Sequence, residues 1–147
     1  MLDNRIPPPL VFLALGAGMY AFGADGDASP LRLGLVALLV LAAGAFGLPA
    51  VAAFRRAGTT IDPVRIDRAS SLVTTGIFAR SRNPMYAALV LTLCAWAAWL
   101  GGWMVWLGPV ALVLWLDRFQ IRPEERSMAT RFGADYDAYR ARTRRWL

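Results

Sequence analysis

The sequence of 147 residues contains no histidine and no lysine, and its one cysteine is Cys94. Without histidine, a Ser-His-Asp triad, an imidazole base and a histidine metal site are all excluded. A single cysteine excludes an internal disulfide and a thiolate metal cage. Cys94 itself lies inside an apolar run, which is typical of a small core side chain rather than a reactive thiol. We therefore expect no bound metal and no cysteine chemistry.

Charge is also scarce, because 57% of the residues are hydrophobic and only 18% are charged. Residues 31–54 and 85–116 are almost free of charge over lengths that exceed a typical buried core helix. This balance disfavours an ordinary soluble domain. It predicts an all-α, polytopic membrane protein in which residues 1–147 form a single integral-membrane domain.

The 16 basic residues are all arginine, and with ten acidic residues they give a net charge of +6. Such a charge could indicate nucleic-acid binding, but the arginines flank apolar segments, where the positive-inside rule accounts for them. Six lie in residues 55–84 and eight in residues 117–147, whereas residues 23–30 hold none. We therefore expect no nucleic-acid partner, and both termini on the cytoplasmic side of a bacterial-type inner membrane.

Four membrane spans satisfy this pattern, at about residues 6–22, 31–54, 85–100 and 102–116. The last two form one apolar run that would extend about 48 Å as a single helix, well beyond a hydrocarbon core of roughly 30 Å. The run must therefore fold back, and Gly101-Gly102 at its midpoint predicts a tight helical hairpin. A signal peptide is the alternative for the first span, although Ala24-Asp25-Gly26-Asp27 offers no clean cleavage site.

Two polar segments remain, a cytoplasmic loop at residues 55–84 and a cytoplasmic tail at residues 117–147. Phe132, Tyr136 and Tyr139 recur at helical spacing in the tail, which predicts a helix that packs back onto the bundle. No acidic residue lies inside a span, so the buried carboxylate expected of a small proton-coupled exporter is missing. The chemistry of this chain is therefore expected at one membrane face.

Two polar clusters lie at that face, Arg82-Asn83-Pro84-Met85-Tyr86 and Arg122-Pro123-Glu124-Glu125. Each alone fits an ordinary helix start, with Asn83 as a cap before Pro84, and with two glutamates in a first turn. The predicted hairpin nevertheless brings both clusters to the same face. Backbone N–H groups at a helix start suit a carboxylate, and paired carboxylates suit an ammonium or a sulfonium. A zwitterionic, amino-acid-like ligand fits this arrangement.

Several motifs between residues 57 and 147 resemble those of integral-membrane methyltransferases, the group that includes isoprenylcysteine carboxyl methyltransferases and phospholipid N-methyltransferases. The matching residues, in order, are Leu72-Val73-Thr74-Thr75-Gly76-Ile77-Phe78, Arg82-Asn83-Pro84-Met85-Tyr86, Glu124-Glu125, Phe132-Gly133, Tyr136, Tyr139 and Arg144-Arg145-Trp146. The first two spans resemble the family only in being apolar.

The resemblance implies S-adenosylmethionine as the cofactor, bound at the cytoplasmic ends of the last spans and covered by the tail. The cofactor contacts that it implies are Ser70, Ser71, Leu72, Val73, Phe78, Asn83, Pro84, Tyr86 and Glu124. Glu125 is expected beside them in a catalytic role.

The chain departs from the family pattern at two positions. Asn83 stands where many members have histidine, so an amide must make that contact. Gln120 stands where the isoprenylcysteine branch has an arginine that is taken to hold the substrate. Arg118 and Arg122 lie nearby in the sequence and could supply this cation instead.

The expected reaction is methyl transfer, at the cytoplasmic membrane face, to a lipophilic or small amphipathic acceptor. The group of the acceptor that receives the methyl group is a carboxylate, a thiol or an amine. In-line displacement needs alignment of the reacting atoms and exclusion of water rather than a histidine. An amine acceptor must lose a proton, which Glu125 or solvent could accept. The alternative is a non-enzymatic membrane protein, a small transporter or a scaffold, whose arginines bind membrane lipids.

Overall fold

The computed structural model describes residues 6–23, 29–58 and 71–147, and this part of the chain is helical and contains no strand. The all-α prediction is thereby confirmed. One isolated parallel bridge joins Ser81 to Arg144. The main helices are α1 (Pro8–Tyr20), α2 (Pro30–Arg56), α3 (Pro84–Leu100), α4 (Leu107–Trp115) and α5 (Arg122–Arg142), with short 3-10 turns η2 (Gly76–Ala79) and η3 (Met104–Trp106) and a π-helical turn η4 (Leu116–Ile121).

Proline marks the start of the first three long helices. Pro8, Pro30 and Pro84 occupy the first turns of α1, α2 and α3. Proline suits this position because its φ is already helical and its missing N–H would have no partner there. At α2 the preceding Ser29 also caps the helix, since its hydroxyl accepts the backbone N–H of Arg32 at 3.3 Å.

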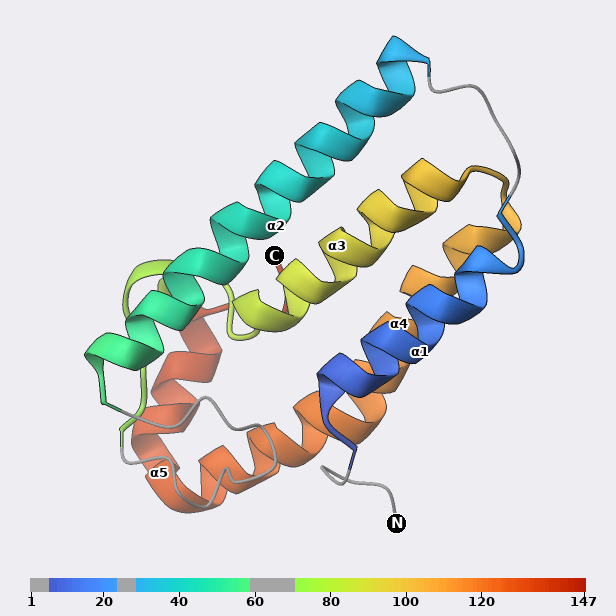
Figure 1. Ribbon diagram of the computed structural model, residues 1–147. Coiled ribbons are helices and arrows are strands. Elements are labelled where there is room, and N and C mark those ends of the chain that lie inside the picture. The colour runs from blue at the N-terminus through green and yellow to red at the C-terminus, as the bar shows by residue number, and fades with distance from the viewer. Residues whose placement is uncertain (1–5, 24–28, 59–70) are drawn as a thin grey trace.

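The predicted hairpin forms at the two central glycines. The helix α3 ends at Leu100, and Gly101, with φ of 72°, and Gly102, with φ of 84°, follow it. Residues with a Cβ atom rarely adopt such backbone angles, so glycine permits the reversal. After the turn η3, α4 runs back beside α3 (Figure 1).

The helices pack as a bundle in which α3 is central: α2 lies along one side of it, and α1 contacts both α3 and α4 (Figure 1). Small residues allow this close approach, since a Cβ atom at Gly108 would lie 2.3 Å from the sulfur of Met19. The buried core is Met19, Leu93, Ala97, Val105, Leu112, Leu116 and Ile121.

Two helices are long and apolar enough to cross a membrane, Pro30–Arg56 and the continuous helical stretch Met104–Arg142. The second is apolar only in its first part, because charged residues begin at Asp117. The helices α1 and α3 are apolar but shorter. Apolar side chains cover the outside of α2, where Leu31, Leu41 and Leu48 are each more than 70% exposed.

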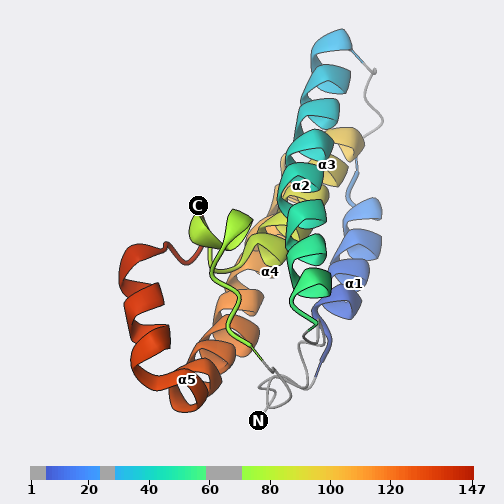
Figure 2. The same cartoon turned by 90° about the vertical axis from the view of Figure 1, so that its left-hand side faces the viewer.

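The start of α5 corrects the prediction that Arg122-Pro123-Glu124-Glu125 forms an ordinary helix start. Ile121, the residue before it, has helical angles, so η4 runs into α5 without a break. Glu124 and Glu125 therefore do not face a free helix N-terminus, as an ordinary first turn would require. The chain instead bends at Gly133, with φ of 49° and ψ of −124°, and returns the C-terminus to the segment before α3 (Figure 2).

Candidate functional site

A cavity of about 970 Å³ lies between α2, the start of α3 and α5. Its lining is polar near the start of α3 and apolar along the middle of α2. The predicted cofactor contacts within the described chain all line it: Ser71, Leu72, Val73, Phe78, Asn83, Pro84, Tyr86 and Glu124. Glu125 lines it as well, whereas Ser70 lies outside the described residues.

The two arginines predicted to hold a substrate lie elsewhere. Arg122 is paired with Asp117, at 2.7 Å between its Nη2 and the carboxylate Oδ2, and its side chain is 55% exposed. The guanidinium of Arg118 lies over the ring of Phe119, 5.2 Å from the centroid. Neither residue lines the cavity, so the structure does not bring them together with the predicted cofactor contacts.

Glu124 receives two hydrogen bonds on one carboxylate oxygen. The hydroxyl of Tyr86 donates to its Oε1, and the side-chain amide of Gln120 donates to the same atom at 2.5 Å. Burial raises the pKa of Glu124 to about 7, although both donors act in the opposite direction. The charge of neighbouring Glu125 adds to the rise. Glu124 is therefore a carboxyl group whose ionisation changes near neutral pH.

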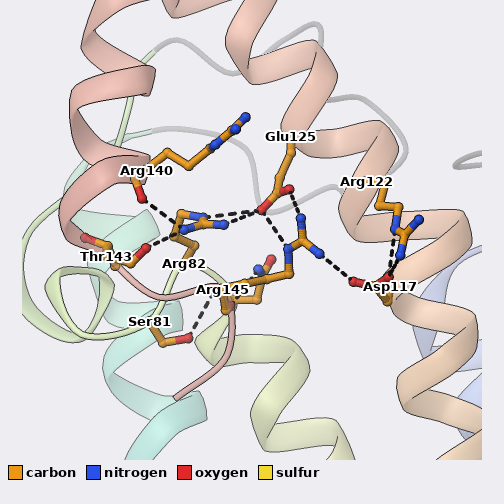
Figure 3. Close-up of polar contacts among 9 residues, drawn as sticks. Ser81, Arg82, Asp117, Arg122, Glu125, Arg140, Thr143 and Arg145 are labelled. Atoms are coloured by element: carbon orange, nitrogen blue, oxygen red, sulfur yellow. Dashed lines mark hydrogen bonds and ion pairs between the residues drawn. The ribbon is translucent and has the colours of Figure 1, made fainter.

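Glu125 has a different environment, because two arginines surround it (Figure 3). Its Oε1 lies 2.7 Å from Nη2 of Arg82, and its Oε2 lies 2.6 Å from Nη2 of Arg145. Burial by itself raises the pKa of Glu125, but the hydrogen bonds and charges of Arg145 and Arg82 outweigh it, so the net pKa is lowered. An ionised, fully paired carboxylate is a weak proton acceptor, which disfavours the predicted role of Glu125 as a base.

The same arginines hold the end of the chain, here called the C-terminal strap and defined as residues 143–147. Arg82 donates through Nη1 to the carbonyls of Thr143 and Arg140, and Arg145 also pairs with Asp117 at 2.9 Å (Figure 3). The backbone N–H of Arg82 donates to the carbonyl of Arg144 at 2.9 Å. The strap is thus fastened to the segment before α3 by main-chain and side-chain bonds together.

Asn83 takes part in this attachment and corrects another prediction. It lies at the N-cap position of α3, but its side chain makes no capping hydrogen bond. Its amide Nδ2 instead donates to the carbonyl of Arg145 at 2.9 Å. Tyr139 makes a similar link, since its hydroxyl donates to the carbonyl of Phe78 at 2.7 Å. Sequence spacing could not reveal these contacts, because about sixty residues separate the partners.

The lining offers groups that suit a zwitterionic ligand with an aromatic part. Ser71 contributes a buried hydroxyl oxygen that has no hydrogen-bond partner among the described residues. Phe78 and Tyr86 supply aromatic surface, and Glu124 supplies a carboxylate. No group of three or more potential metal ligands occurs within the described ranges. The residues present thus fit an organic cation with polar attachments.

Comparison with known families decides which kind of protein carries this site. The model of the phospholipid methyltransferase family matches residues 31–135, which is more than half of the chain. The chain belongs to the phospholipid methyltransferase family. This confirms the family indicated by the sequence motifs, and it implies a membrane methyltransferase.

The chain is also similar to an individual protein, whose description gives no function. An uncharacterized protein of Haemophilus influenzae is 43% identical to this chain over 63 residues, a stretch that covers 43% of this chain and the whole of that protein. No solved structure matches the chain. The membership therefore rests on the sequence, and the arrangement of the site on the structure described above.

Proposed function

We propose that this member of the family transfers a methyl group from S-adenosylmethionine to a lipophilic or small amphipathic acceptor. The observation that carries the proposal is the cavity, because this one space gathers the predicted cofactor contacts from three parts of the chain: the segment with η2, the start of α3, and α5. Coincidental helix starts would not be expected to converge in this way.

In this proposal Glu124 would hold the ammonium group of the cofactor. Tyr86 and Gln120 position its carboxylate by donating to Oε1. The hydroxyl of Ser71 would bond a polar group of the cofactor, since it has no partner in the described chain. Leu72, Val73 and Phe78 would provide apolar surface for the purine. Together these residues would bind the cofactor without a Rossmann domain.

When bound, S-adenosylmethionine supplies a methyl group on a sulfonium, which a nucleophile attacks in line. The residues of this chain then have to align the two reactants and keep water away from them. The apolar lining contributed by α2 serves the second purpose. A carboxylate or thiolate acceptor needs no base. An amine acceptor would pass its proton to solvent, because Arg82 and Arg145 already neutralise Glu125.

The proposed location is a bacterial-type inner membrane, crossed by four spans. These are α1, α2, α3 and the apolar part of Met104–Arg142, with both termini and the arginine-rich segments in the cytoplasm. The cavity lining includes Val40 and Leu48, which are 53% and 75% exposed on α2. A lipophilic acceptor would reach the site sideways from the bilayer at this side of α2.

Calorimetric titration of the detergent-purified protein with S-adenosylmethionine and S-adenosylhomocysteine tests the proposal. Saturable binding is expected, and Glu124→Gln should weaken it by about tenfold or more because a charged hydrogen bond is lost. Tyr86→Ala should weaken it too, since it removes a donor that positions Glu124. Asp135→Asn, an equal change at an exposed residue of α5, is the matched control.

Folded wild-type protein that binds neither compound would contradict the proposal. The non-enzymatic alternative, a transporter or lipid-binding scaffold, would then be favoured.

A further inference from the structure

One face of α2 forms a continuous wall of the cavity. The wall residues recur at intervals of three and four, which places them on one side of the helix. From its first residue to its last, this wall extends about 22 Å along α2 at 1.5 Å per residue. The apolar part, here called the α2 trough, consists of Val40, Ala43, Gly44, Gly47, Leu48, Val51 and Phe54, and Arg55 follows it.

The shape of the α2 trough suits an extended apolar chain. Gly47 brings α2 close to α3, since a Cβ atom there would lie 3.2 Å from Cβ of Ala88. At Gly44 there is room, because an added Cβ would meet only Leu48 Cδ1 at 4.0 Å. The missing side chain of Gly44 thus leaves a space in the middle of the helix face, and exposed apolar side chains border it.

Arg55 gives this trough a charged end. Among the residues that the structure describes, two arginines line the cavity, Arg55 and Arg82. Arg82 is already bonded to Glu125 and to the C-terminal strap. In contrast, the structure shows no hydrogen bond or ion pair of the Arg55 guanidinium within the part of the chain that it describes. Among the described residues that line the cavity, Arg55 is therefore the arginine that has bonding capacity left for a ligand.

The neighbouring Arg56 shows that a position in the last turn of α2 does not by itself place an arginine in the cavity lining. Both arginines occupy the last turn of α2, where a cation is favoured by the helix dipole. Successive helical residues are rotated by about 100°, so Arg55 and Arg56 point in different directions from the helix axis. Arg55 lines the cavity and Arg56 does not. The two residues form a natural pair for comparison.

We propose that Arg55 binds the anionic group of the methyl acceptor while the α2 trough holds its apolar chain. The acceptor is then an amphiphile that carries a phosphate or a carboxylate. This inference rests on the proposed function, and it replaces Arg118 and Arg122 with Arg55 as the residue that holds the substrate. Arginine suits both anions because its planar guanidinium donates two parallel hydrogen bonds to them.

The test compares wild type, Arg55→Gln, Arg55→Lys and Arg56→Gln in micelles of dodecyl maltoside, a detergent that carries neither phosphate nor carboxylate. Each is titrated with dodecyl phosphate, dodecanoate, dodecanol, inorganic phosphate and S-adenosylhomocysteine. All four proteins share the same detergent, so partitioning of an amphiphile into the micelle cancels in the comparison. Binding of S-adenosylhomocysteine reports on the proposed function separately from the amphiphiles.

Arg55→Gln should weaken binding of dodecyl phosphate and dodecanoate by about tenfold, because a charge-assisted hydrogen bond is lost. Arg56→Gln should change it by less than about twofold, as for an exposed surface charge. Arg55→Lys should retain part of the affinity. Dodecanol and S-adenosylhomocysteine should bind all four proteins alike.

Equal losses in Arg55→Gln and Arg56→Gln would overturn the inference, since general surface charge would then explain binding. Weakened binding of S-adenosylhomocysteine in Arg55→Gln alone would make Arg55 a cofactor contact instead. If inorganic phosphate displaces dodecyl phosphate as effectively as dodecanoate does, the site is one for a soluble anion. This result would overturn the lipid assignment. A wild type that fails to bind S-adenosylhomocysteine would overturn the proposed function, and the bound amphiphile would then not be an acceptor.

Discussion

Each end of the helical bundle is held by an arginine that donates to backbone carbonyls far away in the sequence. At the hairpin end, Arg32 of α2 donates to the carbonyls of Ala98, at 2.8 Å, and Trp99. These carbonyls belong to the last turn of α3, where a helix lacks internal partners. At the cavity end, Arg82 donates to Thr143 in the C-terminal strap, but it also pairs with the carboxylate of Glu125.

The two ends differ in whether pH and ligand charge can act on the groups that hold them. The hairpin end depends on backbone angles at Gly101 and on carbonyl groups, neither of which titrates. The cavity end depends on charged side chains around Glu125 and on Glu124, whose pKa of about 7 lies near neutrality. Ligand charge and pH are therefore expected to act on the cavity end and to leave the hairpin end unchanged.

The largest expected effect comes from removing the shared carboxylate at the cavity end. Glu125→Ala leaves Arg82, which is 10% exposed, without its carboxylate partner, and it leaves Arg145 paired with Asp117 alone. The free energy of unfolding should fall by about 2–3 kcal/mol, below the value for fully buried pairs because Arg145 is partly solvated. Reversible denaturation in mixed micelles measures this loss.

Asp135→Ala, at an exposed position of the same helix, serves as the control for Glu125→Ala. It should change the unfolding free energy by less than about 0.5 kcal/mol. Similar stabilities of the two variants would show that the ion pairs do not fasten the strap.

The next effect tests the hairpin end. Gly101→Ala forces a Cβ atom into a backbone with φ of 72° and places it 2.8 Å from Nη2 of Arg32. The strain should cost about 2 kcal/mol of unfolding free energy. Affinity for S-adenosylhomocysteine should stay within about twofold of wild type, because the cavity lies at the other end. Calorimetry on the folded fraction measures this affinity.

Gly34→Ala is the matched control for Gly101→Ala, since a Cβ atom there meets nothing within 4 Å. It lies inside α2, where alanine is the better helix former, so stability should rise slightly. If Gly101→Ala abolished cofactor binding while the fold was retained, the two ends would not be independent.

The smallest effect is a pH dependence of cofactor affinity. Glu124 must be ionised to bind an ammonium group, and its pKa of about 7 means that protonation competes below neutrality. Between about pH 8 and pH 6 the affinity for S-adenosylhomocysteine should fall by about tenfold, or about 1.4 kcal/mol. Calorimetry in two buffers should also detect proton release on binding below pH 7.

Glu124→Gln should abolish this pH dependence, whereas Tyr86→Phe should retain it with a changed midpoint, because Tyr86 donates to Glu124. If the affinity of the wild type did not change with pH, Glu124 would not be the residue that binds the ammonium group.

Much of the fold follows from residues that act locally. Pro8, Pro30 and Pro84 mark helix starts, and the long apolar runs predict helices. The hairpin at Gly101 follows from a length argument, since one helix would exceed the membrane thickness. The continuity of η4 with α5 could not be predicted, because Pro123 and the two glutamates also fit a new helix start.

The site was predictable to the extent that short motifs carry it. The motifs around Leu72, Asn83 and Glu124 identify residues that line one cavity. Arg55 carried no signal in the sequence, since it is one of sixteen arginines and belongs to no motif. Only its position at the end of the α2 trough makes Arg55 a candidate for binding the acceptor.

The sequence by itself determined the helical class, the family and the position of the hairpin, because each depends on composition or on neighbouring residues. Only the tertiary structure decided the roles of the charged residues. Glu124 and Glu125 are adjacent in the chain, yet burial raises the pKa of the first and two arginines lower the pKa of the second. Partners such as Arg82 and Arg145 come from distant segments, so folding alone sets which carboxylate is neutralised and which remains available to a ligand.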